Sequence, residues 1–137
     1  MLYAHAATAQ RVERMDVRAI AAHSDSVSAD LLNAPPGMAS LPTWSALLVR
    51  VVLRDPTPGG TRVRLESRWH NPLRTGAGRT QWTTQIARAP RAAGSSGLVV
   101  PVLVHGSQCT VTLRARIEGQ PLARAVEHVV TLGTCGE

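Results

Sequence analysis

The sequence contains no phenylalanine and no lysine, and it has only one tyrosine and three tryptophans among its 137 residues. Without phenylalanine the core must be built from smaller side chains, and valine, alanine and leucine make up most of the 44% hydrophobic content. Valine favours pleated strands because its branched Cβ is stiff at χ1. We expect a single domain over residues 1–137, with residues 1–10 as a flexible N-terminal segment.

Because lysine is absent, all 15 basic residues are arginines, and the chain has a formal charge of +6. A basic chain can bind nucleic acid, an anionic membrane or an acidic glycan. Alternatively, a genome rich in G and C makes arginine, alanine, glycine and proline frequent together. The arginines are dispersed and form no long basic run, so the sequence does not favour nucleic acid as a partner. No stretch is long and apolar enough to predict a transmembrane segment.

In residues 61–69, charged side chains alternate with side chains that are apolar or small. This pattern predicts a strand with one side on the core and one in water. The preceding run, 44–54, also favours a strand. Its second side is half apolar, which predicts a central position in a sheet. Residues 55–60 between the two runs are rich in proline and glycine, as turns are. We therefore predict that 44–54 and 61–69 pair as a β-hairpin.

A second hairpin is predicted at residues 109–117 and 122–132, and further strands at 11–21, 81–87 and 98–104. Residues 11–21 also fit a short helix. Pro101 cannot donate to a β-ladder, which places 98–104 at a sheet edge or at a kink. About seven short antiparallel strands are typical of a sandwich or a barrel. We expect an all-β antiparallel sandwich of immunoglobulin- or fibronectin-like topology.

Both cysteines, Cys109 and Cys135, lie near the end of the chain. One disulfide or two buried thiols would account for them, and we expect the disulfide. A straight hairpin would leave the two Cα atoms too far apart for a bond, so the chain is expected to turn back at Gly133. A disulfide implies an oxidising compartment, and we predict a periplasmic or secreted protein.

No catalytic motif is present. The five histidines have no spacing typical of metal ligands, the serines lack a GxSxG elbow, and no two carboxylates form a recognisable acid/base pair. We therefore predict no enzymatic activity, no cofactor and no metal site.

Two groups of residues predict a binding surface. Trp69 and Trp82 flank a glycine-rich stretch that begins after His70, and exposed aromatic rings can stack on sugars or anchor a protein. Alternatively, both tryptophans fill a core that lacks phenylalanine. The outward side of 61–69 carries Arg62, Arg64 and Arg68, and Arg50 and Arg54 would extend it if 44–54 lay alongside. This basic stripe is either a solvated surface or a site for an acidic partner.

The leading hypothesis is a non-catalytic, exported β-sandwich that acts as a protein-interaction or structural module of an envelope or surface assembly. Its partner would be another protein of that assembly. The alternative is a carbohydrate-binding module that holds a polysaccharide with Trp69 and Trp82. An enzyme with a dispersed site and a nucleic-acid-binding protein are the remaining hypotheses.

The disulfide can be tested by thiol titration under denaturing conditions. We expect no free thiol before reduction and two after it, and reduction should lower the free energy of unfolding by about 3 kcal/mol, since the bond closes a loop of roughly 25 residues. Two free thiols in the unreduced protein would contradict both the disulfide and the exported location.

Overall fold

The structure is a computed structural model that describes residues 10–21, 32, 44–54, 60–70, 81–89, 97–103 and 110–131. These residues form seven strands and one short 3-10 helix, η2 (Leu122–Arg124). The strands are β1 (Arg11–Ala21), β2 (Trp44–Arg54), β3 (Arg62–His70), β4 (Thr83–Arg88), β5 (Gly97–Leu103), β6 (Thr110–Ile117) and β7 (Val126–Thr131).

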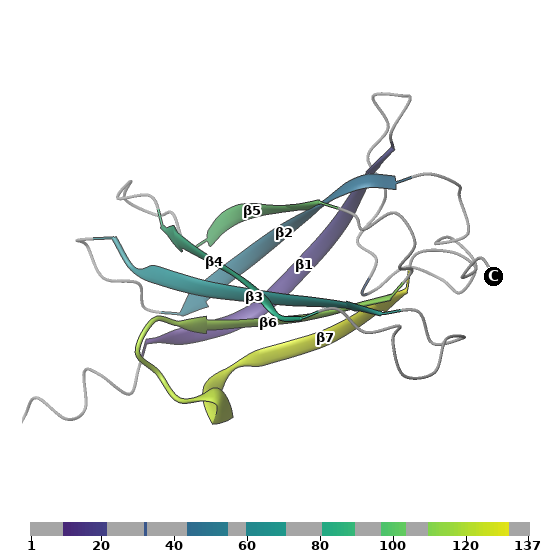
Figure 1. Ribbon diagram of the computed structural model, residues 1–137. Coiled ribbons are helices and arrows are strands. Elements are labelled where there is room, and N and C mark those ends of the chain that lie inside the picture. Colours follow the sequence, from purple (N-terminus) through teal and green to yellow (C-terminus); the bar gives the residue numbers. More distant parts are fainter. Residues whose placement is uncertain are drawn as a thin grey trace, which may run out of the picture.

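The strands form two antiparallel sheets that face each other (Figure 1). One sheet has three strands in the order β1-β2-β5, and the other has four in the order β4-β3-β6-β7. Strand β1 lies close to β6 and β7 of the other sheet, and β4 lies close to β5. The predicted all-β antiparallel sandwich is therefore confirmed.

The core lies between the sheets and consists of inward side chains at alternate positions. Trp69 is its one aromatic residue among the residues described, and the rest are aliphatic or Met15. Its fully buried members are small and branched, as the lack of phenylalanine predicted. The largest of these are Leu47, Leu65, Leu113, Val17, Val49, Val51, Val63 and Val111.

The strand predicted over residues 11–21 is confirmed, and its helical alternative is wrong. Met15, Val17 and Ala19 are buried at alternate positions of β1, as a strand requires. A register shift between Val12 and Arg14 allows Val12 to face the core as well.

The predicted hairpin of 44–54 with 61–69 is wrong. Strand β2 pairs with β1 and β5, whereas β3 pairs with β4 and β6, so the chain passes from one sheet to the other between β2 and β3. Both strands are central, and each has a neighbour on both sides. Period-two alternation shows which side of a strand is buried but not which strand lies next to it.

The C-terminal hairpin of β6 and β7 is confirmed, with a different register from the simplest one. A two-residue turn would place Arg114 opposite Ala125, but Arg114 pairs with Glu127 and Val111 with Val130. Helix η2 lengthens the connection between β6 and β7. Gly119, near the start of this connection, has a positive φ of 90°. Val126 and Val130 face the core, whereas Val129 is exposed.

Strands β4 and β5 lie at sheet edges and occur close to the predicted ranges 81–87 and 98–104. The edge position expected from Pro101 is confirmed, because β2 is the one described strand that pairs with β5. Cys109, Cys135 and Gly133 lie outside the described residues, so the disulfide stays a prediction. Residues 1–9 of the predicted N-terminal segment also lie outside them.

The core can be tested by shortening one leucine. Leu113 on β6 is completely buried, and Leu113→Ala should lower the free energy of unfolding by about 2–5 kcal/mol in urea denaturation, because it leaves a cavity between the sheets. Leu103→Ala on β5 is the matched control, since Leu103 is 79% exposed, and its effect should stay within about 0.5 kcal/mol. Equal losses from the two variants would contradict the assignment of core and surface.

Candidate functional site

The outward side of the four-stranded sheet carries six arginines, which we call the arginine layer. Strand alternation places them there, because their neighbours at odd positions of β3 and β6 are buried in the core. The members come from three adjacent strands: Arg62, Arg64 and Arg68 of β3, Arg88 of β4, and Arg114 and Arg116 of β6.

Glu66 provides the central negative charge of the arginine layer. Although it lies on the outward side of β3, its side chain is only 9% exposed. Its Oε2 accepts a hydrogen bond of 2.9 Å from Nη2 of Arg114, and its Oε1 lies 3.7 Å from Nη2 of Arg116. Glu66 is thus paired across the strands with two arginines of β6. One carboxylate is covered by two guanidinium groups, so removal of its charge would leave half-buried cations without compensation.

Trp82, just before β4, packs on the same layer. The guanidinium carbon of Arg114 lies 4.0 Å from the ring centroid of Trp82, and that of Arg68 lies 4.6 Å from it. Both distances are within the range of cation–π attraction. The indole is half-buried, and the two guanidinium groups occupy space in which a sugar or another ligand would stack.

Trp69 does not belong to this surface. It lies on the inward side of β3 with 3% of its surface exposed. The predicted exposed pair of Trp69 and Trp82 is therefore not formed, because the two side chains project from opposite sides of the same sheet. The side chain of Trp44, the first residue of β2, is outside the described part of the structure.

At the end of β6 the layer is tied to the turn that follows. Nε of Arg64 donates a 3.0 Å hydrogen bond to Oε2 of Glu118, and Nη1 of Arg116 donates to the carbonyl of Gln120 at 3.2 Å. The Gln120 side chain in turn donates to the carbonyl of Gln10 at 2.7 Å, which connects the turn to the residue before β1.

The predicted extension of the basic stripe to Arg50 and Arg54 is wrong. Both belong to β2, and β2 lies in the other sheet. Nη1 of Arg50 lies 3.8 Å from Oδ2 of Asp16 on the neighbouring strand β1. The error follows directly from the incorrect hairpin of β2 with β3.

His70 ends β3 opposite Thr110 and is half-buried, and His105 lies outside the described residues. In the described ranges, no three residues among His, Cys, Asp and Glu lie close enough together to hold a metal ion. His70 therefore lies beside the arginine layer, and it belongs to no group of metal-binding side chains among the described residues.

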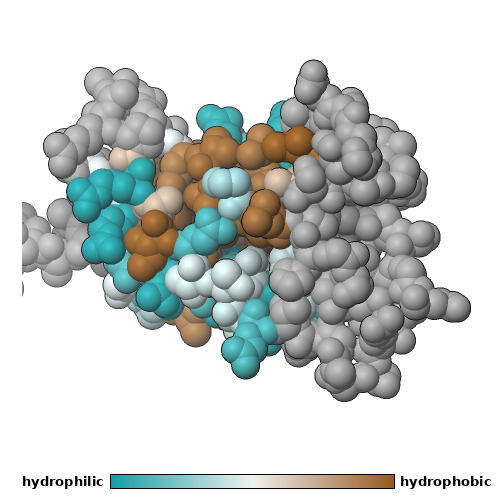
Figure 2. Space-filling model, turned by 45° about the horizontal axis from the view of Figure 1, so that its top comes forward, coloured by the Kyte–Doolittle hydropathy of each residue, from teal (hydrophilic) through white to brown (hydrophobic). Residues whose placement is uncertain are grey.

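The three-stranded sheet carries a different kind of surface on its outward side, which we call the apolar face. Val99 is 56% exposed and Leu103 is 79% exposed, and Pro101 between them is exposed as well. Half-buried side chains continue this surface across the sheet, because Leu103 pairs with Ala46 and Ala46 pairs with Ile20. Figure 2 shows apolar side chains gathered in a brown band on one side of the molecule. The members are Ile20, Ala46, Leu48, Val99, Pro101 and Leu103.

The free edge of β5 is poorly suited to pairing with a further strand. Pro101 has no backbone N–H to offer, and its carbonyl accepts a 3.1 Å hydrogen bond from Nε2 of Gln85 on β4. A partner of this region would therefore contact the outward side chains of β5 and not its backbone.

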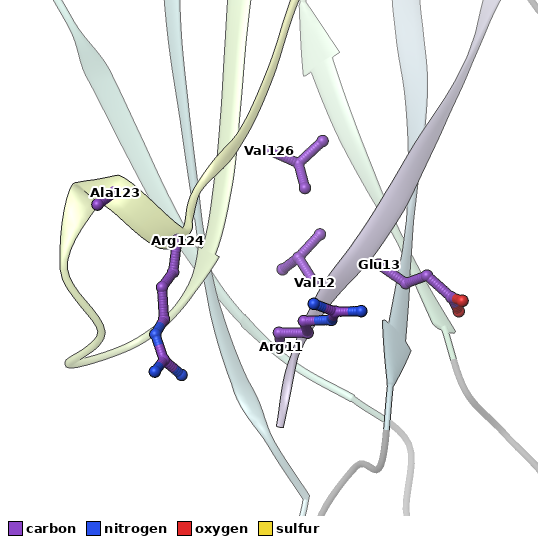
Figure 3. Close-up of a pocket in the computed structure, with 6 residues that line it drawn as sticks. All are labelled: Arg11, Val12, Glu13, Ala123, Arg124 and Val126. Atoms are coloured by element: carbon purple, nitrogen blue, oxygen red, sulfur yellow. The ribbon is translucent and has the colours of Figure 1, made fainter. Parts of the chain in front are cut away.

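A shallow open pocket lies between the start of β1 and the turn before β7, with a volume of about 570 Å³. In Figure 3, Val12 and Val126 point toward each other across it, whereas Arg124 and Glu13 point away. Its floor is thus apolar and its charged side chains lie at the rim. Its polar side chains do not point toward a common position, as they would in a small-molecule site.

The sequence did not indicate that Arg114, Arg116 and the apolar face form parts of a surface. The contacts of these arginines with Glu66 and Trp82 depend on β6 lying next to β3. The outward apolar residues of β5 alternate with buried ones, and only the pairing with β2 shows that they join Ala46 and Leu48 in one surface. The signal that could have indicated the apolar face is the unbroken run of apolar residues in β5, a short strand in which Pro101 already predicts an edge position.

In comparisons with known proteins, no family model matches the chain, and no curated protein or solved structure was found to be similar. Among the described residues, no helix is long and apolar enough to span a bilayer.

The role of Glu66 can be tested with Glu66→Gln. The amide removes the negative charge and turns an N–H₂ donor toward guanidinium donors, so the free energy of unfolding should fall by about 1–3 kcal/mol in urea denaturation. The matched control is Glu127→Gln on β7, an exposed side chain opposite Arg114, which should change stability by no more than about 0.5 kcal/mol. If both variants were equally stable, Glu66 would not organise the arginine layer.

Proposed function

We propose that the protein is a non-catalytic, exported β-sandwich that acts as a protein-interaction or structural module of an envelope or surface assembly. The observation that carries this proposal is the apolar face of the three-stranded sheet. Exposing contiguous apolar side chains to water is unfavourable. An exposed apolar patch on a folded domain therefore marks a contact site for a protein more often than a single exposed apolar residue does.

Exposure and position both support a contact surface. Val99, Pro101 and Leu103 project side by side from the same side of β5, and they have no described side chain above them. Leu48 pairs with Pro101 and widens the surface toward the centre of the sheet. Burial of Leu103 and Val99 against a partner would contribute roughly 1.5–3 kcal/mol each.

The charges around the apolar face indicate the partner. Arg14, Arg18, Arg50 and Arg54 lie on the outward side of β1 and β2, and Asp16 is the acidic residue between them. Two copies of the chain meeting through this side would bring like charges together. The proposed occupant is therefore a different protein, with an apolar centre and an acidic rim.

The carbohydrate-binding alternative receives little support. Of its two proposed stacking platforms, Trp69 is in the core and Trp82 is covered by guanidinium groups. An exposed aromatic ring is what sugar stacking needs, and the described tryptophan side chains do not offer one.

We also propose an immunoglobulin- or fibronectin-like topology, with the Cys109–Cys135 disulfide and a periplasmic or secreted location. The strand order supports the topology, because β1-β2-β5 packs against β3-β6-β7 as the corresponding strands do in such sandwiches. Strand β4 joins the edge of the second sheet next to β3.

The apolar face can be tested with a photo-crosslinking amino acid at position 103 in living cells, and with the same amino acid at Val129, an exposed position on β7 of the other sheet. We expect a distinct crosslinked protein from position 103 alone. With that protein purified, Leu103→Asp should weaken its binding at least tenfold, because a carboxylate would be buried against apolar groups, whereas Val129→Asp should not.

Three outcomes would contradict the proposal: a crosslinked product that is a dimer of this chain, equal crosslinking from both positions, or no loss of affinity in Leu103→Asp. Thermal unfolding of both variants checks that each one is folded.

A further inference from the structure

The arginine layer contains two cations that its carboxylates do not reach. Arg62 and Arg88 face each other directly across β3 and β4, and both are exposed. Side chains in this relation have Cβ atoms about 5 Å apart, and like charges there repel. The pair therefore creates a concentrated positive potential at the end of the sheet.

The carboxylate of Glu118, which follows β6, is already engaged. The backbone N–H of Glu118 donates to the carbonyl of Arg62 at 2.9 Å, but the Glu118 carboxylate binds Nε of Arg64 at 3.0 Å. Glu66, the acidic residue of β3, binds Arg114 and Arg116. Within the described part of the chain, no carboxylate pairs with Arg62 or Arg88.

The Arg88 side chain is held in place by its surroundings. The stem of Arg88 packs on Gly60, where an added Cβ would meet Cγ and Cδ of Arg88 at 3.1 Å. Gly60 has a φ of 89°, so its backbone conformation also favours glycine. The N–H of Ala89 donates to the carbonyl of Thr61 at 2.8 Å and fixes the end of β4 against β3.

We infer that Arg62 and Arg88 form an anion-binding site that accepts a carboxylate from an acidic segment of a partner protein. Two guanidinium groups from opposite strands can donate to the two oxygens of one carboxylate, and the bound charge relieves their mutual repulsion. This site lies on the outward side of the four-stranded sheet, away from the apolar face, so it goes beyond the function proposed above.

The surroundings favour a protein over a glycan or a nucleic acid. Ile86 precedes Arg88 on the same side of β4 and is 45% exposed, so an apolar contact lies about 7 Å from the arginine pair. Bases and sugars are commonly held by an open aromatic ring, and Trp82 is already stacked with Arg68 and Arg114. The fitting segment places a carboxylate and an apolar side chain at that spacing, as an extended Glu-x-Leu sequence does.

The test is an NMR titration of the Nε–H resonances of the arginines with an extended peptide of alternating glutamate and leucine. We expect saturable shifts that are largest at Arg62 and Arg88, and at least tenfold weaker binding in Arg62→Gln and in Arg88→Gln. Arg54→Gln and Arg124→Gln remove exposed arginines elsewhere and should leave the affinity unchanged within twofold. Arg88→Lys keeps the charge but not the planar fork and should also weaken binding several-fold.

Equal shifts at all exposed arginines, or equal losses in the control variants, would overturn the site, because they would indicate general attraction to a basic surface. Heparin and a DNA duplex serve as separate arms of the titration. Saturable binding of either at Arg62 and Arg88, without binding of the peptide, would overturn the protein segment as the ligand.

Discussion

The domain depends on the burial of one side of each sheet against the other. Each strand gives alternate side chains to this interior, and the interior is filled mainly by valine and leucine because phenylalanine is absent. Small branched side chains cover less area each than aromatic ones, so many of them must be buried together, and nearly every inward position of β2, β3 and β6 is apolar. Trp69 adds the one large aromatic group among the core residues described.

The same alternation determines the two outer surfaces. Residues excluded from the core on β3 and β6 are mostly charged, and they can lie side by side because Glu66 is placed between Arg114 and Arg116 and Trp82 stacks with Arg68 and Arg114. On the other sheet, the outward positions of β5 are apolar. The outer side of the four-stranded sheet is therefore mainly cationic, whereas the outer side of the three-stranded sheet combines apolar residues on β5 with charged residues on β1 and β2.

Much of the local structure could be predicted from the sequence, but the arrangement of the strands could not. Alternation in residues 61–69 correctly indicated which side of β3 is buried, and Pro101 indicated an edge. Neither pattern contains information on neighbours, so the pairing of β2 with β1 and β5 was missed and Arg50 and Arg54 were assigned to the wrong surface.

Only part of the candidate site could be predicted from the sequence. Arg62, Arg64 and Arg68 were correctly expected on one outward side, since that follows from period two alone. The tryptophans were ambiguous, because the lack of phenylalanine favours a core role for an indole but does not exclude a surface role. The contact of Trp82 with Arg114 joins residues that are distant in sequence, and it depends on β4, β3 and β6 being adjacent.

The central claim is that β2 and β3 lie in different sheets, because the two distinct outer surfaces depend on it. Backbone NOEs of the isotopically labelled protein test it most directly. The structure predicts cross-strand NOEs between Val49 and Val100 and between Val63 and Ile117, which are partners in the two sheets. A ladder of backbone NOEs between β2 and β3, for example between Val52 and Val63, would contradict it and restore the hairpin.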